Sequence, residues 1–210
     1  MSQSGMRMTS SDGALWRFDP GTLFIEFMLT GGPDQFARYD SLHQPADLEQ
    51  WAAACRLSLD PEAVSATSAD ILAARDLRNA LWRLTRQVIS GSQRDPADVA
   101  TINQAAGSAP LVPQITAAGH GSWRSPITAS AVLSTVARDA IEVLTGPAAG
   151  RLRECAADDC QLVFLDTSRP GARRWCSMER CGNRHKVRAI RSRRSTSAAN
   201  TALINEKGPQ

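Results

Sequence analysis

The four cysteines near the C-terminus form two pairs with equal spacing. Cys155 and Cys160 are separated by four residues, as are Cys176 and Cys181, and fifteen residues lie between the pairs. Paired cysteines allow two short loops each to supply two thiolates to one tetrahedral metal ion. The spacing therefore predicts one zinc ion per chain. Disulfide pairing and an iron–sulfur cluster are the alternatives, because spacing alone does not identify the metal.

A site closed by four thiolates has a structural role. It leaves no open position for water or substrate, so it is not a hydrolytic centre. The segment around it, residues 151–194, is too small to bury much core, and we expect the metal to supply most of its folding free energy. The expected apolar packing comes from Leu162, Phe164, Trp175 and Val187.

The stretch between the cysteine pairs has the composition of a β-hairpin. Residues 161–165 read as a strand, residues 168–171 as a tight turn, and residues 172–175 as a return strand. The second pair then leads into a helical segment at residues 183–194. The sequence therefore predicts a small finger made of a hairpin and a helix.

Charge is divided unevenly along the chain. Residues 151–194 carry 12 basic and 5 acidic side chains, whereas residues 1–150 carry 11 basic and 15 acidic ones. A compact basic segment joined to a mildly acidic domain is expected when only one part meets a polyanion. A solvated basic helix, or one that binds an acidic protein surface, is the alternative.

The helix after the last cysteine carries the candidate phosphate contacts. At 100° per residue, Arg184, Arg188 and Arg191 fall within about 60° of one another and form one ridge. We expect Val187 and Ile190 to pack on the hairpin beside this ridge. The full set of predicted nucleic-acid contacts is Arg173, Arg174, Asn183, Arg184, Lys186, Arg188, Arg191 and Arg193. Asp166 is expected to pair with the two arginines before Cys176.

The part of the chain before the finger reads as an α+β domain over residues 12–148, mainly helical with a small antiparallel sheet. Apolar periodicity and turn signals predict helices at residues 45–55, 68–89, 95–106 and 127–144, and hairpins at residues 14–29 and 111–124. Cys55 falls on an apolar helical face and is expected to be buried. Residues 1–11 and 195–210 are expected to be mobile tails.

Other functional classes find little support in the sequence. No signal-peptide core and no apolar run long enough to span a membrane occurs, so we expect a cytoplasmic protein with no membrane partner. The three histidines form no recognisable catalytic arrangement, and no phosphate-binding glycine loop is present. Glu26 with Asp40 or Asp139 is the one acid–base pair that can be suggested. We expect a protein that is not an enzyme.

Three motifs resemble the CGNR zinc-finger family: residues 164–168 (FLDTS), 173–178 (RRWCSM) and 181–184 (CGNR). The resemblance implies a C-terminal finger held by the four cysteines, after an N-terminal ABATE-type domain, in bacterial proteins regarded as transcription regulators. The N-terminal likeness is looser. Where that family usually has an Asn-Thr pair, this chain has Leu29 and Thr30, so a role of that asparagine cannot be transferred.

Taken together, these observations predict a zinc-dependent, DNA-binding transcription regulator. The finger helix would contact DNA, and the N-terminal domain would sense a small-molecule ligand or assemble a homodimer. A structural finger that mediates protein–protein or RNA interaction is the alternative.

Overall fold

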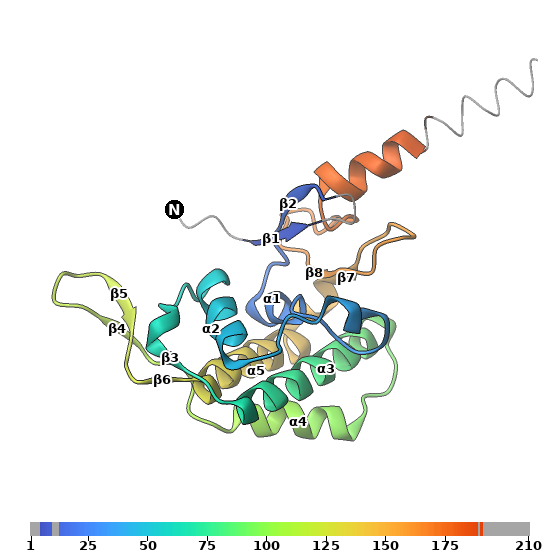
Figure 1. Ribbon diagram of the computed structural model, residues 1–210. Coiled ribbons are helices and arrows are strands. Elements are labelled where there is room, and N and C mark those ends of the chain that lie inside the picture. Colours follow the sequence, from blue (N-terminus) through green and yellow to red (C-terminus); the bar gives the residue numbers. More distant parts are fainter. Residues whose placement is uncertain (1–4, 10–12, 189, 191–210) are drawn as a thin grey trace, which may run out of the picture.

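The computed structural model describes residues 5–9, 13–188 and 190. Most of the chain is a helical body. It consists of α1 (Leu23–Met28), α2 (Pro45–Ala54), α3 (Ser68–Ser90), α4 (Pro96–Ala106) and α5 (Ala129–Thr145). Helices α3, α4 and α5 pack against one another, and α1 and α2 cover them from the side that faces the finger (Figure 1). This confirms the four predicted helices, with bounds that differ by at most a few residues.

Local signals explain where the long helix α3 begins and ends. The Thr67 hydroxyl accepts the backbone N–H of Asp70, and the Asp70 carboxylate accepts the N–H of Thr67 in return. This reciprocal cap satisfies backbone donors that the first turn leaves free. The helix ends at Gly91, whose φ of +71° lies in the left-handed region that favours glycine.

The strands form separate two-stranded pairs. In the helical body, β3 (Val64–Ser65) pairs in parallel with β6 (Ile127–Thr128), and β4 (Pro113–Ile115) pairs antiparallel with β5 (Gly121–Trp123). The β4–β5 hairpin is the one predicted around residues 119–121, and it projects from the body (Figure 1). The helical body with small sheets confirms the α+β class.

The first predicted hairpin is wrong in its second half. Residues 22–29 were expected to be a strand, but Leu23–Met28 form α1, whose residues are all buried. A continuous apolar run does not distinguish a buried strand from a buried helix. The helix is fixed by Asp139, which accepts the Thr22 hydroxyl and the Phe24 N–H and so caps the first turn.

The strand partner comes from a segment that was expected to be mobile. Strand β1 (Met6–Thr9) pairs antiparallel with β2 (Leu15–Phe18), in a register that places Met8 opposite Trp16. The prediction of a mobile tail is therefore wrong for these residues. The other predicted tail, residues 195–210, lies outside the described residues.

The finger also has a hairpin, but not the one predicted. Strand β7 (Leu152–Glu154) pairs antiparallel with β8 (Val163–Leu165), so the hairpin encloses the first cysteine pair. Residues 172–175 form no strand and are joined to the hairpin loop by the Ala156 N–H, which donates to the Arg174 carbonyl at 2.9 Å. A π-helical turn, Met178–Gly182, then leads into α-helix at residues 183–188 and 190.

The β1–β2 hairpin belongs to the finger rather than to the helical body. A second core brings Phe18 of β2 together with Phe164 and three of the four cysteines, and Met8 and Trp16 pack against it. The finger also packs on the body, because Leu152 of β7 and Val163 of β8 lie in the core of the helical body. The N–H of Leu165 in addition donates to the Pro20 carbonyl at 2.8 Å. Strands β1 and β2, which precede the helical body in the sequence, therefore complete the finger, and the sequence did not indicate this.

The three carboxylates considered as an acid–base set are engaged separately. Glu26 is buried and accepts the Arg56 guanidinium at 3.0 Å, while Asp139 caps α1. Asp40 pairs with Arg75 and with the buried Arg78. Each carboxylate therefore has a structural partner.

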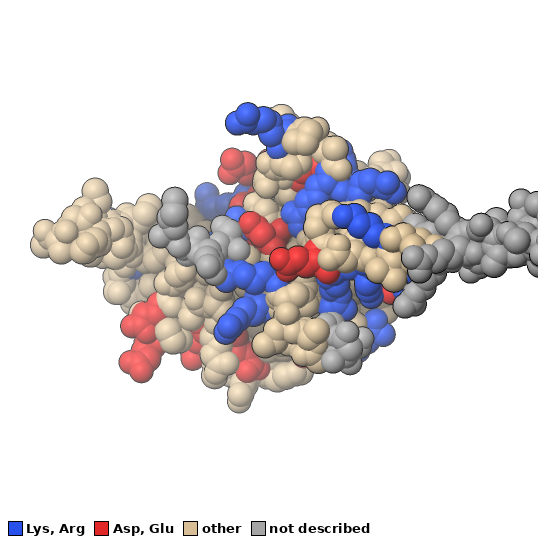
Figure 2. Space-filling view, turned by 90° about the horizontal axis from the view of Figure 1, so that it is seen from above, with Lys and Arg blue, Asp and Glu red and all other residues tan. Residues whose placement is uncertain are grey.

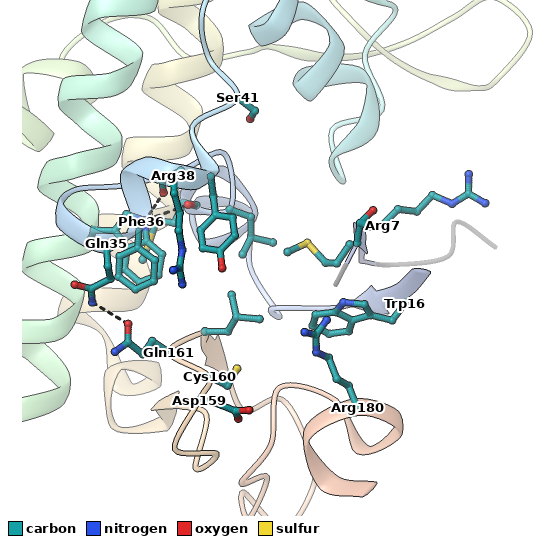
Figure 3. Close-up of a pocket in the computed structure, with 18 of the residues that line it drawn as sticks. Arg7, Trp16, Gln35, Phe36, Arg38, Ser41, Asp159, Cys160, Gln161 and Arg180 are labelled. Atoms are coloured by element: carbon teal, nitrogen blue, oxygen red, sulfur yellow. Dashed lines mark hydrogen bonds between the residues drawn. The ribbon is translucent and has the colours of Figure 1, made fainter. Parts of the chain in front are cut away.

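Figure 2 looks down on the finger side of the molecule. Lys and Arg side chains gather on this face, with a few acidic side chains between them. A cleft lies between the helical body and the finger (Figure 3). Within the described residues, no helix has the length and apolarity needed to cross a membrane.

Candidate metal centre and nucleic-acid interface

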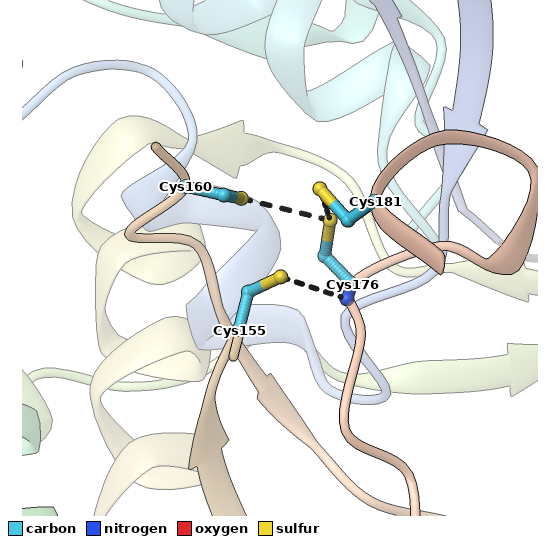
Figure 4. Close-up of side chains that lie close together, drawn as sticks. All are labelled: Cys155, Cys160, Cys176 and Cys181. Carbon is cyan, nitrogen blue, oxygen red and sulfur yellow. Dashed lines mark hydrogen bonds between the residues drawn. The ribbon is translucent and has the colours of Figure 1, made fainter. Parts of the chain in front are cut away.

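The structure brings the four predicted cysteines into one cluster (Figure 4). Their sulfur atoms all lie within 4.8 Å of one another, and Cys176 Sγ is 3.4 Å from Cys181 Sγ and 3.7 Å from Cys160 Sγ. A tetrahedral ion with Zn–S distances of about 2.3 Å separates its sulfur ligands by about 3.8 Å. The cluster is therefore consistent with a single zinc ion.

Short-range backbone contacts position the first cysteine pair. Strand β7 ends directly before Cys155, whose N–H donates to the Leu162 carbonyl at 2.9 Å and extends the hairpin by one bond. The chain then turns, and the Cys160 N–H donates to the Ala157 carbonyl at 2.9 Å. This loop holds both thiols on the same side, toward Cys176 and Cys181.

The second pair, Cys176 and Cys181, is positioned by a contact with the first pair and by the π-helical turn. The Cys176 N–H donates to Cys155 Sγ at 3.4 Å, and the π-helical turn carries Cys181 back toward Cys176. Cys155, Cys176 and Cys181 are buried, whereas Cys160 is half-buried and borders the cleft. A closed site with buried sulfurs stabilises the fold of the finger and offers no position for a substrate.

Cys55 lies apart from this cluster, as predicted. It is buried at the end of α2 in the core of the helical body. Burial raises the pKa of its thiol to about 12, so the side chain remains a neutral thiol at physiological pH.

Two arginines offset the negative charge that a tetrathiolate zinc centre carries. Arg184 donates to Cys181 Sγ at 3.2 Å, and this sulfur, followed by the Asp159 carboxylate, raises the pKa of Arg184. The Arg173 guanidinium donates to the carbonyls of Asp19, Trp175 and Cys176. Burial lowers the pKa of Arg173. These three hydrogen bonds give Arg173 a role in the fold of the finger.

Asp166 has a different partner from the one predicted. It is fully buried and accepts the backbone N–H groups of Ser168 and Arg173, both at 2.9 Å. It therefore fixes the turn between the cysteine pairs, and it does so through the main chain of Arg173 rather than through the guanidinium.

The predicted ridge is present for the two members that the structure describes. Arg184 and Arg188 lie on the same side of the helix and both donate to the Asp159 carboxylate, at 3.0 and 3.1 Å. Arg191 and Arg193 lie outside the described residues. Asn183 is exposed, and its amide donates to the Glu179 carbonyl at 3.3 Å.

Other basic side chains of the finger face solvent. Arg174 and Lys186 are exposed, and the Arg174 guanidinium lies 5.3 Å from the centre of the Trp175 ring. That ring is 4.7 Å from the His185 ring. Arg174, Trp175 and His185 therefore form a cluster of aromatic and basic side chains.

The two apolar residues of the finger helix do not pack as predicted. Val187 is 46% exposed and Ile190 is 50% exposed. The core of the finger is filled instead by Phe18 of the N-terminal hairpin, which takes the place that the helix was expected to occupy. The helix is consequently free on most of its surface.

Sequence reasoning missed the acidic partner of the ridge. Asp159 lies in the loop between Cys155 and Cys160, 25 residues from Arg184. Only the folding of the two cysteine pairs around one centre brings the loop and the helix together. The signal available in the sequence was the position of Asp159 directly before a metal ligand.

Two known families match separate parts of the chain. Residues 21–147 match the family named ABATE, described as "Putative stress-induced transcription regulator". Residues 151–194 match the family described as "CGNR zinc finger". No curated protein matches the chain.

Proposed function

The chain belongs to the ABATE family of transcription regulators and carries a CGNR zinc finger, and from this premise we propose that it binds DNA through the finger helix. In this proposal zinc folds the finger, the helix after Cys181 meets DNA, and the helical body provides ligand sensing or assembly. The site of action would be the cytoplasm.

The observation that carries the proposal is the exposure of basic side chains on a helix that the metal centre holds in place. Lys186 and Arg188 are exposed on the helix, which begins at Asn183 after the turn that holds Cys181, and Arg174 is exposed in the segment before Cys176. Lys and Arg side chains on a rigid helix match the spacing and charge of phosphates, which dominate affinity for DNA. Asn183 at the start of the helix would approach base edges if that end enters a groove.

Asp159, the acidic partner of the ridge, competes with DNA for two of its arginines. Asp159 occupies Arg184 and Arg188, so a phosphate must displace its carboxylate to contact either arginine. Both pairs are partly exposed, and such pairs contribute only about 0–1 kcal/mol each. A phosphate contact can therefore offset the loss of these ion pairs. The two arginines would join the interface only where a phosphate displaces Asp159.

Selection of bound sequences from random duplex DNA, with full-length zinc-loaded protein and a structured-RNA competitor, tests the proposal. We expect enrichment of a DNA sequence and retention of the complex when RNA is added. Preferential capture by the RNA would replace DNA with RNA as the partner. Loss of all nucleic-acid binding in protein with intact zinc would favour the interpretation that the finger binds an acidic protein surface.

A further inference from the structure

The cleft between the helical body and the finger has the size of a ligand pocket. Its volume is about 1050 Å³. Small-molecule sites typically occupy about 300–1,000 Å³ and lie preferentially where two domains meet. Figure 3 shows Phe36 and Arg38 on one side, Trp16 and Arg180 on the opposite side, and Asp159 and Cys160 at the base.

The first wall is a rigid aromatic surface of the helical body. Phe36 stacks on Trp82 with ring centres 4.2 Å apart and planes 12° from parallel. The Trp82 indole N–H donates to the carbonyls of Met28 and Gly31, at 3.0 and 2.7 Å. A Cβ atom at Gly32 would lie 2.6 Å from Trp82 Nε1, so the chain passes this ring at a distance that only glycine allows.

The second wall comes from the finger and its N-terminal hairpin. Trp16 of β2 faces Arg180 of the π-helical turn, whose guanidinium lies 5.0 Å from the centre of the indole ring. The Trp16 indole Nε1 is buried and has no hydrogen-bond partner among the residues that the structure describes. The two walls are linked near the base by Gln35 and Gln161, whose side-chain amides are 2.8 Å apart.

Arg38 and Arg180 are two of the four arginines that line the cleft. Arg38 lies 4.8 Å from the centre of the Tyr39 ring, and Arg180 lies over Trp16. Within the described part of the chain neither arginine forms an ion pair, whereas Arg184 at the base is occupied by Asp159. A guanidinium placed on an aromatic ring keeps its planar donor edge free for a carboxylate or a similar anion.

We propose that this cleft binds a small aromatic anion. The ring of the ligand would lie against the aromatic side chains of the walls, and its anionic group would accept hydrogen bonds from Arg38 and Arg180. This inference names the site and the ligand class for the sensing role in the proposed function and rests on it. Asp159 lines the cleft and also pairs with Arg184 and Arg188, so the cleft borders the ridge.

Calorimetric titration of full-length, zinc-loaded protein with 2-naphthoate, in the absence of DNA, tests the proposal. We expect saturable binding of one molecule per chain and quenching of tryptophan fluorescence, because Trp16 and Trp82 line the cleft. The neutral 2-naphthamide should bind about tenfold more weakly, since it keeps the ring but loses the charge-assisted hydrogen bonds.

Variants locate the binding within the protein. Arg38→Ala and Arg180→Ala should each weaken 2-naphthoate about tenfold and weaken 2-naphthamide much less, because the amide oxygen accepts weaker hydrogen bonds than a carboxylate. Arg94→Ala removes an exposed arginine that does not line the cleft and should change neither. Arg38 lies on the wall remote from the metal, so it keeps the test valid if Arg180→Ala loses zinc.

The proposal is overturned if 2-naphthoate fails to saturate, if the amide binds equally well, or if Arg38→Ala behaves like Arg94→Ala. Because no DNA is present, these outcomes are independent of whether the finger binds DNA. If the protein binds DNA but not 2-naphthoate, the proposal that the cleft binds an aromatic anion is refuted, and the proposed DNA-binding function is unaffected.

Discussion

Replacing Asp159 by asparagine separates the ridge from its internal partner. The Asp159 carboxylate accepts Arg184 at 3.0 and 3.2 Å and Arg188 at 3.1 Å. The side chains are 38%, 57% and 41% exposed for Arg184, Arg188 and Asp159. Partly exposed pairs of this kind contribute about 0–1 kcal/mol to stability, so Asp159→Asn should keep its fold and its zinc.

The effect on DNA binding should be larger than the effect on stability. Each phosphate contact on duplex DNA contributes about 0.9 to the slope of log K against log salt. If the variant frees both arginines, the slope should become steeper by up to about 1.8, and the affinity at about 0.1 M salt should rise by up to about 60-fold. Fluorescence anisotropy with a labelled duplex, measured across a salt series, gives both quantities.

Asp158→Asn is the matched control. Asp158 is the exposed neighbour of Asp159, and it forms no ion pair among the residues that the structure describes. Asp158→Asn changes the net charge by the same amount as Asp159→Asn without releasing an arginine, so it should alter the affinity for DNA far less. If Asp159→Asn holds stoichiometric zinc but binds no more tightly than Asp158→Asn, the interpretation of Asp159 as a brake on the ridge is refuted.

Three further predictions concern the fold and the metal. Cys176→Ser should lose zinc together with the structure of the finger and of the β1–β2 hairpin. Its circular dichroism spectrum should keep most of the helical signal, and loss of all helical signal would show that the two cores do not fold separately. Cys55→Ala should retain one zinc per chain by elemental analysis, since this buried thiol lies in the other core, and loss of metal would contradict that placement. Asp40→Asn should lower the free energy of unfolding by about 2–3 kcal/mol at neutral pH, because it leaves the buried Arg78 guanidinium without its carboxylate. Burial disfavours ionised Asp40, but hydrogen bonds from Arg78 and the Leu42 N–H outweigh it and lower the Asp40 pKa. Its stabilisation should therefore be complete above the unfolded pKa and vanish as pH falls through the folded value, so urea unfolding should show a smaller wild-type-to-variant difference at low pH than at pH 7.

The long helices and the metal site could be predicted because their signals are local. Helix α3 carries an apolar stripe, a reciprocal cap and a terminal glycine within its own sequence. The residue type and spacing of the four cysteines predict a metal site without any knowledge of the rest of the fold.

The failures share a different cause: each depends on a partner that is distant in the sequence. Leu23–Met28 is a helix because Asp139, more than 100 residues away, caps it. The finger helix leaves Val187 exposed because Phe18 from the N-terminal hairpin fills the finger core. Neither contact produces a local pattern, so periodicity and turn signals could not reveal them.

The central claim is that the zinc-held helix of the finger binds DNA, and the salt dependence of binding tests it most directly. Full-length protein should bind a duplex obtained by selection with a steep slope, and Arg174→Ala with Lys186→Ala, which removes two exposed basic side chains of the finger that Asp159 does not hold, should flatten that slope by about 1.8 while zinc remains stoichiometric. The control removes two exposed arginines of the helical body, Arg94→Ala with Arg124→Ala, and should leave the slope nearly unchanged. Equal slopes and affinities for the two double variants would contradict the claim.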